Sequence, residues 1–104
     1  MNTTPILGTP LLYQVNKDSV GNPIPLQNQT AHTLAVQATN FGAGAVTIEW
    51  SLDNTEWSPL LGADGKAVTF TQNGLVSGLL LNGIYLRASL SGSTGAQNVT
   101  VTLN

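Results

Sequence analysis

Turn signals recur along this chain at a nearly constant spacing. From Gly42 onward, clusters of Gly, Asn and Asp have centres about nine to eleven residues apart. They are Gly42–Gly44, Asp53-Asn54, Asp64-Gly65, Asn73-Gly74, Asn82-Gly83 and Gly92–Gly95. This spacing is typical of an antiparallel sandwich or barrel. Because a two-residue type I′ turn needs positive φ at both positions, which Asx and Gly accept readily, we expect tight hairpins at Asp64-Gly65 and Asn73-Gly74.

Apolar and polar residues alternate between these turns, as they do in strands that bury one face. The alternation covers residues 32–38, 46–52, 84–90 and 99–103. No window carries the apolar stripe of an amphipathic helix. We therefore predict an all-β fold, an antiparallel β-sandwich of seven to eight strands that is immunoglobulin-like or jelly-roll-like. Trp50 lies mid-strand among the inward positions and is the expected centre of the core.

The first residues of the chain lack this periodicity. Pro5, Gly8 and Pro10 fall within residues 1–12. They predict an extended N-terminal arm over 1–12, with a strand beginning near Leu11, followed by one β-sandwich domain over 13–104. Arms of this kind often lie on a neighbouring subunit, so Pro5, Ile6, Leu7 and Leu11 are expected to contact a partner.

Charge is scarce in this sequence. Only 8% of the residues are charged, with three basic and five acidic side chains, whereas about a quarter is usual for a soluble domain. Phosphate binding needs clustered Lys and Arg, and the three basic residues here are scattered singly, so nucleic acid is not an expected partner. The chain has no Cys, which excludes disulfides and thiolate metal sites. It shows neither a secretory signal nor an apolar run long enough to span a bilayer, so we expect synthesis in a cytoplasm and no membrane partner.

Residues that carry chemistry are few. His32 is the single histidine, so a catalytic triad would need it together with Asp18, Asp53 or Asp64. It starts a strand on the apolar face, which favours a structural role. Asp53, Asn54 and Glu56 place oxygen atoms in one loop, but their spacing matches no dedicated cation loop. We expect no enzyme, no metal site and no cofactor.

Two aromatic residues are candidates for ligand stacking. Trp57 follows a turn, where it either packs over the edge of the sandwich or presents its ring to a sugar or a protein. Tyr85 faces away from the core in its strand. Glu49 and Arg87 also face outward, and they form a cross-strand ion pair if their strands are neighbours.

Runs of leucine indicate contact surfaces. Successive side chains alternate in a strand, so Leu79–Leu81 cannot all point inward. The same holds for Leu60-Leu61 and Leu11-Leu12. Either a loop covers the outward leucines, or residues such as Leu61 and Leu80 contact other subunits.

Two segments resemble a known group of proteins. Residues 46–60 contain Ser51-Leu52-Asp53-Asn54-Thr55-Glu56-Trp57, and a later strand contains Tyr85-Leu86-Arg87-Ala88. The pair is similar to small β-sandwich proteins of tailed-bacteriophage particles, although Asn54 stands where Gly is usual. The resemblance implies a virion component, made in the host cytoplasm, and transfers no ligand residue.

The sparse charge agrees with that resemblance, because like charges repeated in every copy of a crowded lattice repel one another. The expected function is that of a capsid decoration (cement) protein, a homo-oligomer and most simply a trimer, bound to the major capsid protein or another virion protein. A tail or fibre module remains an alternative. A carbohydrate-binding sandwich that uses Trp57 and Tyr85 is another.

Overall fold

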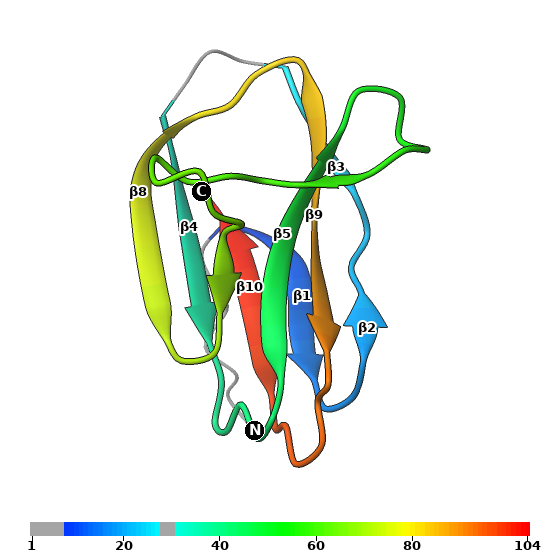
Figure 1. Cartoon of the computed structure of the whole chain (residues 1–104), viewed down its shortest axis with the longest axis vertical. Helices are drawn as coiled ribbons and strands as arrows, with labels where there is room; N and C mark the ends of the chain where they lie inside the picture. Colours follow the sequence, from blue (N-terminus) through cyan, green and yellow to red (C-terminus); the bar gives the residue numbers. More distant parts are fainter. Residues whose placement is uncertain (1–7, 28–30) are drawn as a thin grey trace.

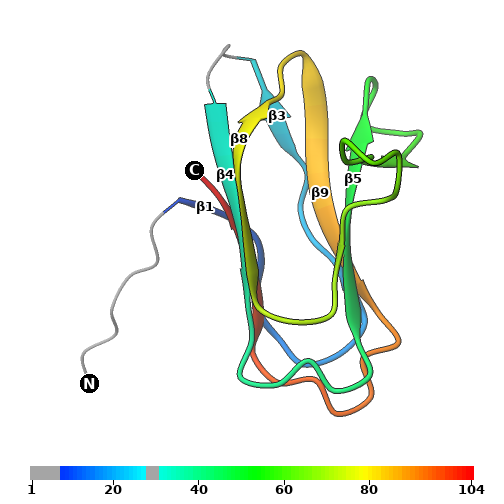
Figure 2. The same cartoon turned by 60° about the vertical axis from the view of Figure 1, so that its left-hand side comes forward.

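The computed structural model describes residues 8–27 and 31–104, and in these residues the regular structure consists of β-strands. The strands form two antiparallel sheets that pack face to face (Figure 1, Figure 2). They are β1 Thr9–Val15, β2 Ser19–Val20, β3 Ile24–Leu26, β4 Ala31–Gln37, β5 Ala45–Ser51, β6 Ser58–Pro59, β7 Thr69–Phe70, β8 Gly74–Leu80, β9 Ile84–Ser91 and β10 Val99–Leu103. The predicted all-β sandwich is confirmed. The strand number exceeds seven to eight because β2, β3, β6 and β7 are short pieces of two or three residues.

Each sheet combines strands that lie far apart in the sequence. One sheet has the order β1-β10-β4-β8, which places β10 between β1 and β4. The other has the order β2-β9-β5-β6, with β3 also paired to β9 and β7 to β5. The strands β5, β9 and β10 follow the alternation predicted for them, since Val46, Ile48, Leu86, Ala88 and Val101 are buried.

The core lies between the sheets and is aliphatic at its centre. Leu34, Ile48 and Leu86 are fully buried. Trp50 is only partly buried against this cluster, so its predicted place at the centre is wrong. It lies near the end of β5, where its side chain lines a small surface hollow together with Leu52 and Asp53. Leu52 is the last inward position of the alternation predicted over residues 46–52, but it is 72% exposed because β5 ends at Ser51 and a turn follows.

The beginning of the sandwich differs from the predicted arm. β1 starts at Thr9 and pairs with β10, so residues 9–12 belong to the sheet. Leu11 and Leu12 are both buried, at 2% and 4% exposure. The β-bulge between Pro10 and Leu12 explains this, because its extra residue breaks strict alternation and allows two consecutive side chains to face the core. Pro5, Ile6 and Leu7 lie outside the described residues.

The two expected tight hairpins also differ in detail. At Asp64-Gly65 the chain does reverse, but through a three-residue loop. Gly62 N donates to the Lys66 carbonyl at 2.8 Å, and Gly65 takes the left-handed conformation with φ 78°. Asn73-Gly74 is no hairpin, because β7 pairs with β5 and β8 pairs with β4, so the chain crosses between the sheets there. Asn73 instead accepts a hydrogen bond from Ala38 N through Oδ1.

Candidate functional site

The two sheets differ in charge. None of the four strands β1, β10, β4 and β8 contains Asp, Glu, Lys or Arg. We call β1-β10-β4-β8 the uncharged sheet. Two charged residues, Glu49 and Arg87, lie in β5 and β9 of the other sheet, and four more lie in the loops between its strands β5, β6 and β7. The remaining two, Lys17 and Asp18, lie in the loop that joins β1 to β2. We call that second sheet, with these loops, the charged sheet. The strands of one sheet therefore carry no charged side chain, and most of the few charged residues belong to the other sheet.

The uncharged sheet exposes leucines along its margin. Leu75 and Leu80 of β8 are 67% and 78% exposed. They pair with Ala35 and Ala31, which face outward because Leu34 and Val36 face the core. Within the described sheet, β8 is an edge strand, and it carries neither the Lys nor the Pro that commonly protects such an edge. These features are typical of a surface that contacts other protein.

Three of the leucines predicted as partner contacts lie in the described residues, and the structure places each of them differently. Leu80 is exposed while Leu79 and Leu81 pack against the core, which confirms that the run cannot point inward as a whole. Leu61 is exposed too, at 59%, but it lies in the charged sheet between β6 and β7. Leu11 is a core residue, so the structure contradicts its assignment as a surface contact.

The outer face of the charged sheet holds the first candidate stacking site. Glu49 and Arg87 are direct cross-strand partners, and Arg87 Nε donates to Glu49 Oε1 at 2.9 Å, as expected. The Arg87 guanidinium lies 4.1 Å from the centroid of the Trp57 ring. One face of this indole is therefore occupied by a cation within the protein. Tyr85 is half-buried on the same strand and pairs with Ser51 and Pro25.

The loop that contains Asp53 bonds to itself. Asp53 Oδ1 accepts hydrogen bonds from the backbone N of Thr55 and of Glu56 at 2.9 and 3.0 Å, and from Ser51 Oγ at 3.0 Å. The Glu56 amide, followed by the Thr55 amide and the Ser51 hydroxyl, holds the pKa of the Asp53 carboxyl below its ordinary value. Asn54 has φ 63°, the left-handed conformation expected for it. The carboxylate thus accepts the hydrogen bonds that hold the turn together.

His32 has no carboxylate partner among the described residues. Its Nδ1 lies 3.2 Å from the Asn104 carbonyl oxygen, and its buried Nε2 has no hydrogen-bond partner in the described part of the chain. Asp18, one of the acids considered for a triad, instead accepts from Ser93 Oγ at 2.6 Å. That hydroxyl and the Ser93 amide lower the pKa of Asp18. Across residues 8–27 and 31–104, no three His, Asp or Glu side chains gather as metal ligands.

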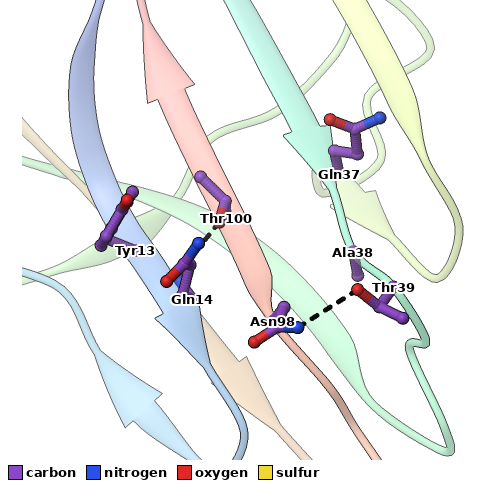
Figure 3. Close-up of a pocket in the computed structure, with 7 residues that line it drawn as sticks. All are labelled: Tyr13, Gln14, Gln37, Ala38, Thr39, Asn98 and Thr100. Atoms are coloured by element: carbon purple, nitrogen blue, oxygen red, sulfur yellow. Dashed lines mark hydrogen bonds between the residues drawn. The ribbon is translucent and has the colours of Figure 1, made fainter. Parts of the chain in front are cut away.

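The uncharged sheet also carries a groove that the sequence pattern does not predict. It has a volume of about 450 Å³ and lies across β1, β10 and the end of β4. Figure 3 shows side chains from β1 on one side, those from the end of β4 on the other, and Thr100 and Asn98 between them. Its polar and aromatic side chains are Tyr13, Gln14, Gln37, Thr39, Asn98 and Thr100. The one trace of it in the sequence is the run Leu-Leu-Tyr-Gln in β1, which breaks the alternation of apolar and polar residues without showing where the side chains lie.

No protein-family model matches this chain, and no curated protein or solved structure is significantly similar to it. In the described segments, no helix is long and apolar enough to cross a membrane.

Proposed function

We propose that this chain is a non-enzymatic structural protein of a bacteriophage virion, a capsid decoration protein that binds the outer surface of the shell and stabilises it. The observation that carries the proposal is the segregation of charge between the two sheets. The uncharged sheet is the docking face in this proposal, and the charged sheet faces solvent.

Physical reasons support this orientation. Burying a charge at an interface costs free energy unless it is paired, and the strands of the uncharged sheet contain no formally charged side chain. Burying an exposed leucine such as Leu75 or Leu80 stabilises a contact by about 1.5 to 3 kcal/mol. The Thr, Gln and Asn side chains of this face can bond across ordered water. A partner such as the major capsid protein, and other copies of this chain in a trimer, fit such a surface.

The residues that carry the phage resemblance explain how one loop folds. They do not indicate where in a virion the chain lies. Ser51, Asp53 and Trp57 build one loop, in which Ser51 is buried and accepts from Asn54 N at 2.9 Å. A motif that makes a turn in this way can recur in sandwiches of different function. A tail or fibre module would use the same docking face. Binding of the chain to shells or to tails distinguishes the two possibilities.

The carbohydrate alternative at Trp57 and Tyr85 is less well supported. Stacking needs an open aromatic face, and Arg87 covers one face of Trp57. Tyr85 is half-buried. Trp57 and Tyr85 therefore do not form a flat, exposed pair of rings on which a sugar could stack.

A co-sedimentation assay tests the proposal. Undecorated shells of the parent particle are mixed with the wild type, with Leu75→Lys/Leu80→Lys and with Leu61→Lys. Leu61 is a matched control, since it is an exposed leucine of the charged sheet. We expect the double variant to lose shell binding and the control to keep it, with both melting like the wild type. Equal binding of the double variant, or loss of binding only in the control, contradicts this docking face.

A further inference from the structure

The groove on the uncharged sheet is lined by neutral hydrogen-bonding groups around one aromatic ring. Tyr13 is 46% exposed there. No residue that lines the groove is charged. We propose that this groove binds a neutral carbohydrate, with Tyr13 as the stacking surface. The inference goes beyond the proposed function. Because the groove lies in the sheet proposed to dock, it concerns the free protein, and a docked shell would compete with the sugar for this face.

A second irregularity in β1 builds one wall of the groove. Leu12 pairs with Val101 and Val15 pairs with Val99, so β1 uses one residue more than β10 over this interval. Tyr13 and Gln14 consequently both lie on the exposed side, between the buried Leu12 and the partly buried Val15. A regular strand would send one of the two side chains into the core. Bulges are enriched beside binding sites because they redirect side chains in this way.

The backbone of Gln14 is fixed in an unusual conformation. Its φ is 49°, in the left-handed region that a Gln side chain seldom adopts. Its N–H donates to Thr100 Oγ1 at 3.0 Å, which ties the bulge to the middle of the groove (Figure 3). This strained conformation persists because the surrounding sheet holds it.

Asn98, which also lines the groove, is held by hydrogen bonds to two other parts of the chain. It also has a left-handed backbone, with φ 56°. Its N–H donates to Asn16 Oδ1 at 2.8 Å. Its Nδ2 donates to Thr39 Oγ1 at 3.2 Å, the bond drawn in Figure 3. These bonds orient the amide while leaving its Oδ1 without a protein partner in the described residues. Two left-handed residues that are not glycine thus line one groove.

The chemistry of the groove selects the ligand class. Among the described contacts, the side-chain amides of Gln14 and Gln37 and the Tyr13 hydroxyl make no hydrogen bond within the protein. They offer both donors and acceptors, which is what the hydroxyls of a sugar require. A sugar ring also has an apolar face of C–H groups that packs on an aromatic ring. A phosphate or carboxylate ligand would find no cationic side chain in the lining.

NMR chemical-shift mapping tests this site. The ¹⁵N-labelled chain is titrated with maltohexaose, cellohexaose, chitohexaose and mannohexaose, each to millimolar concentration, and with the acidic oligosaccharide of alginate for comparison. We expect at least one neutral probe to shift the amides of Tyr13, Gln14, Asn98 and Thr100. Tyr13→Ala should weaken that binding about tenfold or more. Tyr13→Phe, which keeps the ring, should retain most of it. Tyr85→Ala is the matched control and should bind as the wild type does.

Three outcomes overturn the inference. They are the absence of shifts at the groove with every neutral probe, shifts centred on Trp57 and Tyr85, and binding of the alginate probe alone. Shell co-sedimentation of Tyr13→Ala separates the two proposals. A Tyr13→Ala variant that loses sugar but binds shells supports the groove separately from the docking face. Wild-type protein that binds sugar but no shell supports the groove and contradicts the docking face.

Discussion

Asp53 organises the loop after β5 through a single carboxylate oxygen. That oxygen receives two backbone N–H groups and the Ser51 hydroxyl. All three bonds favour the ionised carboxylate, which is why its pKa lies below the ordinary value. A group with a lowered folded-state pKa contributes stability above its unfolded pKa and loses that contribution as pH falls through the folded value.

We therefore predict a defined acid sensitivity. The melting temperature of the wild type should fall once the pH drops below about 4, the ordinary range of an Asp carboxyl. Asp53→Asn should melt lower at neutral pH and show a weaker dependence on acid, while Asp18, bonded to Ser93, keeps its own share. Asp64→Asn is the control, because Asp64 accepts one bond, from Lys66 N. Thermal melts between neutral and acidic pH measure this. An Asp53→Asn variant that melts like the wild type at neutral pH contradicts it.

At the scale of elements, β1 is the strand whose side-chain directions the sequence pattern does not predict. Alternation correctly identified β5, β9 and β10, because each keeps one register with a neighbour through its buried residues. β1 has two shifts in register against β10. Leu11-Leu12 therefore both point in and Tyr13-Gln14 both lie exposed, and a period-two pattern cannot show this. The groove was missed for the same reason, since it depends on the second shift and on a contact with Thr100, 86 residues away.

The first shift in β1 leads to a stability prediction. Leu11→Ala should lower the free energy of unfolding by about 2 to 5 kcal/mol, because it leaves a cavity in the core. Leu61→Ala should change it by less than about 0.5 kcal/mol, because Leu61 is already 59% exposed. Urea denaturation of the two variants measures the contrast. Equal, small losses would mean that Leu11 lies on the surface, as an N-terminal arm requires.

At the scale of the whole molecule, the sandwich has one sheet with charged strands and one sheet whose strands carry no charged side chain. The sequence revealed that charge was scarce, but it gave no location, because that depends on which strands share a sheet. β1, β4, β8 and β10 are scattered along the chain and come together only through the topology. That these four uncharged strands share one face is thus a property of the folded molecule.

A contact made through the uncharged sheet should respond little to salt. Screening weakens interactions between exposed charges, and the Debye length falls from about 14 Å at about 0.05 M to about 4 Å at about 0.5 M salt. The strands of the proposed docking face contain no charged side chain to be screened. We predict that the affinity for undecorated shells changes by less than about threefold over this range, because burial of Leu75, Leu80 and their neighbours does not depend on ion pairs. Co-sedimentation titrations at the two salt concentrations measure it. If the affinity falls by about tenfold or more, the charged sheet, with Glu49, Arg87 and its acidic loops, is the face that binds.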